Sequence, residues 1–252
     1  MYRTVTLIIT IFIFVSCTAA EKKEIKASSI VKQLKKGNHI HYHNKIIVDD
    51  LDFSKVSEPF LMSAGAFQQE IESNIFFSDC IFLGKVTSNG KKGNYPIKSI
   101  FAKNLIFLNC DFRDEVDFSE AIVNGLLNFS KSVFHENANF NGMTVWSKDA
   151  YFSEIKAEKR FSVIYSLFAD NLFFISATFD DKVSFQQTTI NGNLMFNNGK
   201  FNSRADFDLM KINGKAYFNY AVFEDRANFM GTRNLEEIDF NNTTFNKEPI
   251  FE

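Results

Sequence analysis

Apolar residues in the second half of the chain recur at a fixed spacing of eleven residues. Stepping by eleven from Phe152 to Phe251 meets phenylalanine at nine of ten positions, with Val163 as the exception. The positions are Phe152, Val163, Phe174, Phe185, Phe196, Phe207, Phe218, Phe229, Phe240 and Phe251. A helix places apolar residues three and four apart and a half-buried strand places them two apart, so the spacing is typical of neither.

A second apolar series divides each period into steps of five and six. It consists of Ala157, Phe168, Phe179, Ile190, Phe201, Ile212, Phe223, Asn234 and Phe245. Gly, Asn and Asp lie between the apolar positions, which indicates short strands joined by tight corners. We therefore expect two periods of eleven to form one four-sided coil, so that every second member of a series stacks on the same face.

Within each repeat, a small residue stands two positions before the aromatic one. Residues two apart in a strand point to the same side. In Ala205-Asp206-Phe207, for example, the first and third residues point inward and the aspartate points outward.

The same register occurs between residues 101 and 145, shifted by one residue. Its members are Phe107, Phe112, Phe118, Val123, Phe129, Phe134, Phe140 and Val145. The shift predicts one extra residue between Trp146 and Tyr151, as a bulge or a longer corner.

Triplets such as Ala205-Asp206-Phe207, Ala227-Asn228-Phe229 and Ala138-Asn139-Phe140 resemble the core of pentapeptide repeats, in a Phe-rich variant that alternates five and six residues. The resemblance covers residues 101–252. It implies an all-β fold, a right-handed quadrilateral β-helix solenoid. Stacked rings would fill its axis, and each buried Phe contributes about 1.5–3 kcal/mol.

The first hundred residues are less regular. Ser28 and Ser29, the apolar residues that follow them and Gly37 predict a short capping helix over residues 28–37, with Ser as the N-cap. Such a helix would cover the open first coil. Residues 38–100 are expected to form irregular first coils, with two loop insertions near 55–74 and 84–100.

The chain opens with a charged Arg3 and an apolar run from Val5 to Val15. Eleven residues are too few to span a bilayer but suit the apolar region of a signal peptide. Phe14-Val15-Ser16-Cys17 resembles a bacterial lipobox, with Phe in place of the usual Leu. The resemblance implies a signal peptide of lipoprotein type over residues 1–16, lipidation of Cys17, and a tether over 17–27. A secretory peptide cut after Ala20 and an uncleaved anchor are the alternatives.

Cys80 and Cys110 occupy matching positions two residues before a Phe, and thirty residues separate them. One coil of two eleven-residue periods plus an eight-residue insertion accounts for that distance, so they are expected to stack in adjacent coils. Buried inert thiols are the favoured interpretation. A disulfide, which an exported setting permits, and a reactive thiol are the alternatives.

His39, His41 and His43 alternate with Ile40 and Tyr42, which places the three imidazoles on one face of a strand. Two of them could share a metal ion, but three on one straight strand are spread too far. A solvated outer face is the favoured interpretation, and no metal site or cofactor is predicted.

Three further positions stand out from the repeat pattern. Trp146, the single tryptophan, lies at the register shift and could fill a widened corner or stack on a sugar. Asn234 takes an inward position and requires either buried hydrogen bonds or a slip that substitutes Leu235. Pro249 in the last repeat removes a ladder donor and argues against end-to-end dimers.

Composition narrows the function classes. Thirty acidic residues against 28 basic ones give a net charge of −2, which argues against nucleic-acid binding and against a strongly acidic DNA mimic. No catalytic motif is present.

The sequence thus predicts a monomeric, non-catalytic lipoprotein, held on a membrane by its lipid anchor, that acts as a rigid structural or protein-interaction module with an envelope protein as partner. Thr18 after the cysteine favours the outer membrane. The alternatives are a glycan-binding or glycan-processing β-helix and, more remotely, topoisomerase protection by DNA mimicry.

Overall fold

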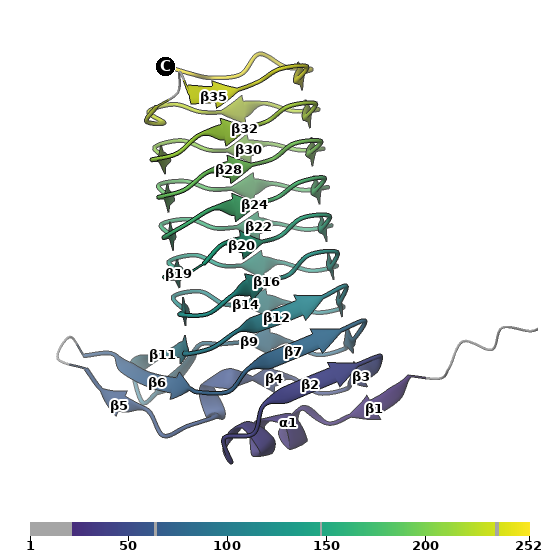
Figure 1. The fold of residues 1–252 in the computed structure, drawn as a ribbon, viewed down its shortest axis with the longest axis vertical. Coiled ribbons are helices and arrows are strands. Elements are labelled where there is room, and N and C mark those ends of the chain that lie inside the picture. Colours follow the sequence, from purple (N-terminus) through teal and green to yellow (C-terminus); the bar gives the residue numbers. More distant parts are fainter. Residues whose placement is uncertain (1–21, 63–64, 147, 235–236) are drawn as a thin grey trace, which may run out of the picture.

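A computed structural model describes residues 22–62, 65–146, 148–234 and 237–252. The chain forms a rod in which four sheets of parallel strands enclose one core, with a single helix at the N-terminal end (Figure 1). Ten strands in one sheet, about 4.8 Å apart, give a rod about 43 Å long. The expected all-β, four-sided β-helix with an N-terminal helix is confirmed.

Each full coil contributes one strand to each of the four sheets, and β1, β5 and β10 are additional strands at the N-terminal end. The first sheet contains β1 (Lys23–Ile25), β3 (Lys45–Ile47), β8 (Ile81–Phe82), β13 (Asp111–Phe112), β17 (Val133–Phe134), β21 (Lys156–Ala157), β25 (Thr178–Phe179), β29 (Lys200–Phe201), β33 (Val222–Phe223) and β36 (Thr244–Phe245). The second contains β4 (Leu51–Asp52), β9 (Val86–Thr87), β14 (Val116–Asp117), β18 (Ala138–Asn139), β22 (Phe161–Ser162), β26 (Val183–Ser184), β30 (Ala205–Asp206) and β34 (Ala227–Asn228).

The remaining strands form the other two sheets. The third contains β5 (Phe60–Leu61), β6 (Phe67–Ile71), β10 (Gly90–Lys92), β11 (Tyr95–Phe101), β15 (Ile122–Val123), β19 (Thr144–Val145), β23 (Leu167–Phe168), β27 (Thr189–Ile190) and β31 (Lys211–Ile212). The fourth contains β2 (Ile40–His43), β7 (Ile75–Ser78), β12 (Leu105–Leu108), β16 (Leu127–Asn128), β20 (Ala150–Tyr151), β24 (Leu172–Phe173), β28 (Leu194–Met195), β32 (Ala216–Tyr217) and β35 (Ile238–Asp239).

The expected coil of two eleven-residue periods is confirmed by strand register. Leu194 of β28 pairs with Ala216 of β32, for example, which is the equivalent position of the next coil. One coil is longer by a residue, because Leu127 pairs with Ala150. The extra residue lies between Val145 and Ala150, where β19 ends and β20 begins, so it lengthens a corner as the register shift predicted.

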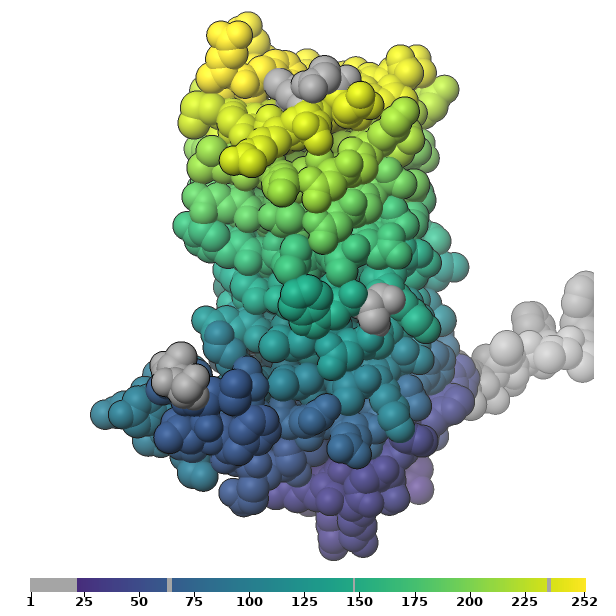
Figure 2. Space-filling view, turned by 60° about the vertical axis from the view of Figure 1, so that its left-hand side comes forward, coloured from purple at the N-terminus to yellow at the C-terminus, as the bar shows by residue number. Residues whose placement is uncertain are grey.

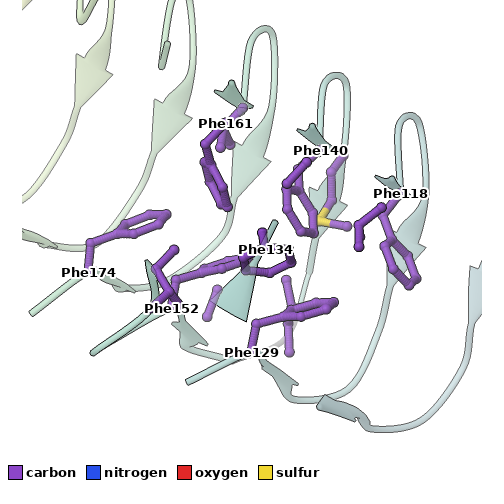
Figure 3. Close-up of a cluster of buried hydrophobic side chains, with 14 of the residues drawn as sticks. Phe118, Phe129, Phe134, Phe140, Phe152, Phe161 and Phe174 are labelled. Atoms are coloured by element: carbon purple, nitrogen blue, oxygen red, sulfur yellow. The ribbon is translucent and has the colours of Figure 1, made fainter. Parts of the chain in front are cut away.

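Phenylalanine rings fill the shaft in ladders that run along its axis. Rings at equivalent positions of successive coils stack nearly parallel, as Phe174 does on Phe196 at 4.9 Å between centroids. Rings from neighbouring faces meet edge to face, as Phe174 meets Phe185 at 5.1 Å and 83°. Figure 3 shows this alternation for the coils around Phe129 and Phe152, whose rings are fully buried. Both geometries suit aromatic rings, with a positive edge and a negative face.

Two of the four corners place a residue in the left-handed backbone region once per coil. One row runs along the edge between the fourth and first sheets, at Asn44, Asp79, Asn109, Lys131, Glu154, Ser176, Asn198, Tyr220 and Asn242. The other corresponding row contains Glu120, Gly142, Tyr165, Gln187, Leu209 and Gly231. Asn and Asp tolerate this conformation best among residues with a side chain. This requirement explains many of the polar residues between the apolar positions of the sequence.

Asparagine side chains tie successive coils together at another corner. The side-chain oxygen of Asn171 accepts the backbone N–H of Asn193 at 2.8 Å, and that of Asn193 accepts the N–H of Lys215 at 2.9 Å. Such bonds satisfy backbone donors that the two-residue strands leave unpaired.

Helix α1 (Ala27–Leu34) covers the open first coil, as expected, and buries Ala27, Ile30 and Leu34. Gly37 follows the helix in a left-handed conformation, with φ +74°, which prevents the helix from continuing. The predicted serine cap is wrong: the N-cap residue is Lys26, and the Ser29 hydroxyl donates instead to the Lys26 carbonyl at 2.7 Å.

Strand β1 pairs in parallel with β3, Lys23 opposite Lys45. The part of the expected 17–27 tether that the structure describes is therefore folded chain. The residues ahead of α1 can join the sheet because β3 would otherwise be an unpaired edge.

Both expected insertions form β-hairpins. Strand β5 pairs antiparallel with β6, and β10 pairs antiparallel with β11. Strands β6 and β11 also pair with each other in parallel, from Phe67 opposite Ile97 to Ile71 opposite Phe101. The two hairpins thus form one projection from the third sheet at the N-terminal end of the rod (Figure 1). The short 3₁₀ helix η1 (Phe53–Lys55) leads from β4 toward it.

Candidate functional site

The predicted lipidation residue, Cys17, lies outside the described residues, as do the signal peptide (1–16) and the first part of the tether. The described chain begins at Lys22 and enters β1 at the N-terminal end of the rod. Within the described ranges no helix is long and apolar enough to cross a membrane.

The two hairpins form the most distinctive surface of the described chain, and we call it the hairpin projection (residues 56–71 and 88–98). Its tip exposes large apolar side chains: Phe60, Leu61, which is 63% exposed, Met62 and Tyr95. The Tyr95 and Phe67 rings meet edge to face at 6.2 Å, and the Lys92 ammonium lies 5.0 Å from the centre of the Phe67 ring. In Figure 2 the projection stands out from the lower part of the rod.

A buried glutamine fixes the base of this projection. The Gln69 amide nitrogen donates to the Phe53 carbonyl and to the Ser99 hydroxyl at 2.8 Å, and its oxygen accepts the Ser57 N–H at 2.9 Å. Gln69 is fully buried. Because each of its polar groups has a partner, the hairpins are held on the shaft by specific hydrogen bonds. Nothing in the sequence signals this role, since Gln69 lies in an insertion outside the repeat.

His41 and His43 of β2, and His39 just before it, face outward as expected, but they contact different partners. The His39 ring accepts the Asn74 N–H at 3.1 Å, and the His41 ring packs edge to face on Phe76 at 4.8 Å. The His43 Nδ1 lies 3.0 Å from the Ser78 hydroxyl and 3.1 Å from Asp79. Among the described residues no three His, Cys, Asp or Glu side chains are grouped to hold a metal ion.

Cys80 and Cys110 lie in adjacent coils as expected and are free, fully buried thiols. Their sulfurs lie 3.3 Å from the Ser78 carbonyl and 3.6 Å from the Leu108 carbonyl respectively. Burial raises the pKa of both thiols, and that of Cys110 most strongly. A thiol that stays protonated is a poor nucleophile, so the arrangement corresponds to the favoured interpretation, buried inert thiols.

A row of charged side chains runs along the outside of the first sheet. The two His135 ring nitrogens lie 3.0 Å from Asp111 and 2.9 Å from Glu158. Lys156 lies 2.8 Å from Glu158 and 3.3 Å from Asp180. Hydrogen bonds from Lys156 and then His135 lower the pKa of the Glu158 carboxyl. The hydrogen bonds that Lys156 donates to Glu158 and Asp180 raise the pKa of Lys156.

Sequence reasoning missed this row, although its members occupy two outward positions that recur in successive coils: Asp111 and Lys156 share one, and His135, Glu158 and Asp180 share the other. Once the coil length is known, that spacing is the signal that would have found them. The row runs across β13, β17, β21 and β25, and in it acidic side chains lie beside basic ones.

The remaining singled-out residues lie on the shaft. Trp146 is 55% exposed at the lengthened corner, so its side chain does not fill the core there. Asn234 is exposed and donates from its side chain to the Ile212 carbonyl at 2.7 Å, so the inward position predicted for it is wrong. It adopts a left-handed backbone with φ 61°, and Leu235, the residue that a slip would substitute for it, lies outside the described residues. Next to Pro249, Ile250 forms an isolated parallel β-bridge with Asn228 of the preceding coil.

A family model described as pentapeptide repeats (9 copies) matches residues 98–144. No curated protein and no solved structure matches the chain. The matched segment is thus a run of pentapeptide repeats, and the four-sheet architecture that contains it continues to β36.

Proposed function

We propose that the chain is a membrane-anchored, non-catalytic pentapeptide-repeat lipoprotein that acts as a rigid structural or protein-interaction module in the cell envelope. The lipobox-like Phe14-Val15-Ser16-Cys17 supports the anchor. An acylated Cys17 with more than one chain would hold the protein stably, which a single chain does not. The partner is an envelope protein, and the rod acts as a monomer.

The filled shaft is the observation that carries the non-catalytic role. Its axis is packed with buried Phe rings, and its outward polar residues bond to each other from coil to coil, as Asn202 does to Asp180 at 2.8 Å. Catalytic sites need a concave pocket with convergent polar groups. The described features that depart from the repeat, α1 and the hairpin projection, instead lie at the N-terminal end, where the anchor would attach.

Cys17→Ser tests the anchor directly. The variant is expected to leave the membrane fraction and to lose incorporation of radiolabelled fatty acid, whereas Thr18→Ser, the matched neighbour, retains both. Equal membrane retention and labelling of Cys17→Ser and wild type would refute the lipoprotein proposal.

Glycan binding is the second candidate, and the exposed Trp146 indole favours it. Aromatic faces provide sugar-stacking area, but that inference from a β-helix rests on analogy of fold. Binding to a glycan array by wild type that Trp146→Ala abolishes would support it. Unchanged binding, or none in wild type, counts against it.

A further inference from the structure

The helix that caps the rod presents a cluster of exposed lysines. Between Glu24 and Asp49 the chain contains five lysines and no acidic residue. Four of them, Lys26, Lys32, Lys35 and Lys36, lie on or beside α1 and are exposed. Within the described chain none of these four forms an ion pair, whereas Lys55 nearby pairs with Asp52 at 3.0 Å. Their charge therefore faces solvent.

The tip of the first hairpin of the projection is apolar and uncharged. Residues 59–69 contain no charged side chain. Phe60 and Leu61 form the edge strand β5 and are 51% and 63% exposed. On the adjacent hairpin Lys91 and Lys92 are exposed beside Tyr95. The combination of exposed apolar side chains with flanking lysines is the composition of segments that lie in a membrane interface.

These two surfaces lie at the same end of the rod and are continuous. In Figure 1, α1 and β5 both lie at the end where the chain enters, below the shaft. A groove of about 540 Å³ lies between them, lined by Lys35 from beside α1, Lys55 from η1, and Glu58 and Pro59 next to β5. The exposed acidic residues beside this groove and α1 are Asp49, Asp50 and Glu58. Asp50 accepts the Lys85 N–H at 2.9 Å, and the four lysines on and beside α1 outnumber these three carboxylates.

We propose that this end of the rod binds an anionic phospholipid surface. The lysines of α1 contact headgroup phosphates, while Phe60, Leu61 and Met62 enter the interfacial layer. The lysine charges favour an anionic membrane over a neutral one. Burial of the apolar side chains stabilises the bound state. This inference rests on the proposed anchoring of the chain at a membrane and extends it: the base contacts the bilayer and the shaft projects away from it. A second copy bound through the free edge of β5 is the competing occupant.

An indole placed at the hairpin tip reports on the contact. Leu61→Trp combined with Trp146→Phe leaves one tryptophan in the full-length lipidated protein. After reconstitution into vesicles of phosphatidylglycerol and phosphatidylcholine, its emission is expected to shift to the blue and to be quenched by brominated lipid. Pure phosphatidylcholine vesicles should give a weaker signal. The matched control is wild type, whose sole Trp146 on the shaft should show neither effect.

Removing the lysine charges tests the electrostatic half of the proposal. Lys32→Gln, Lys35→Gln and Lys36→Gln, combined with the indole probe, should shift the docking equilibrium about fivefold per lysine, and on the order of a hundredfold together. Raised salt should act in the same direction. A tryptophan emission maximum that is the same in phosphatidylglycerol and in phosphatidylcholine vesicles would overturn the membrane proposal. An emission maximum that depends on the density of protein on the vesicle and not on lipid composition would also overturn it and would indicate self-association.

Failure of the anchor is distinguishable from failure of the contact. Intact mass shows whether the protein carries acyl chains. If it carries none, the same probe is read on protein added to preformed vesicles. A blue shift specific to phosphatidylglycerol then still supports the contact, and its absence overturns it.

Discussion

At the scale of single residues, the coil spacing explains why phenylalanine fills the shaft. Strands of successive coils lie about 4.8 Å apart. Phe201 and Phe223 stack at 4.3 Å, and Phe207 and Phe229 stack at 4.9 Å, both 6° from parallel. A flat ring repeated once per coil thus meets its neighbour at a favourable stacking distance. The aromatic repeat of the sequence follows from this match.

Phe196→Ala is expected to lower the free energy of unfolding by about 3–5 kcal/mol, because it leaves a cavity in a fully packed ladder. Phe196 is fully buried, with rings on both sides of it. Phe251→Ala is the matched control, since Phe251 is 37% exposed and stacks on Phe229 alone within its ladder. Urea denaturation measures both. Equal losses in the two variants would contradict the account of the core.

Buried Cys110 predicts a decline of stability in alkaline solution. Burial raises its pKa in the folded protein, whereas the unfolded chain ionises near its ordinary value of about 8.5. Above that pH the unfolded state binds fewer protons than the folded state, so the free energy of unfolding falls as pH rises, by up to about 1.4 kcal/mol per pH unit.

Cys110→Ala is expected to show a shallower decline between about pH 8.5 and 10 than wild type. The measurement is the denaturation midpoint against pH for both proteins. The folded wild type should also resist alkylation at Cys110 and react only in denaturant. Rapid alkylation of the native protein, or identical slopes, would argue against a buried protonated thiol.

At the scale of elements, the cap and the shaft differ in what the sequence reveals. The apolar residues of α1 predicted its existence, but its start was misplaced because Lys26, a residue without a capping side chain, is its N-cap. The hairpins were expected only as loops. Their strands pair with each other across an insertion, as Gly90 pairs with Ile97, and such pairing follows no repeat period.

Within the shaft, the period predicted the faces and the coil length, because one ladder position recurs many times. Asn234 shows the limit of that reasoning. It occupies the ladder position of Ile212 by spacing, yet a local turn exposes it. The charged row around His135 escaped prediction for a related reason: outward residues are under no packing constraint, so their contacts depend on side-chain reach.

Ile30→Ala in α1 should loosen the base of the rod and leave the shaft intact. Ile30 is fully buried, and its truncation costs about 2–5 kcal/mol. Because each coil of a solenoid depends on its neighbours, hydrogen exchange should accelerate in β2 and β4 and stay unchanged in β28 and β32. Ser28→Ala, on the exposed side of α1, should change neither. Uniform acceleration along the whole rod would show that the cap is not a local element.

At the scale of the whole molecule, the rod has two unlike ends and a uniform shaft. The N-terminal end carries the helix and the hairpin projection, whereas the shaft repeats one coil (Figures 1 and 2). The exposed lysines on and beside α1 belong to the same end. A rigid rod of this kind can hold a binding surface on its shaft at a fixed distance from the membrane on which its base lies. The proposed anchor would fix which end meets the membrane.

The intact mass of the mature protein from membrane fractions, with its N-terminal peptide sequenced, tests this account most directly. The account predicts a chain that begins at an acylated Cys17. A chain that begins at Glu21 without lipid would mean free secretion and would favour glycan binding. An intact Met1 in the cytosol would contradict the account and would return topoisomerase protection to consideration.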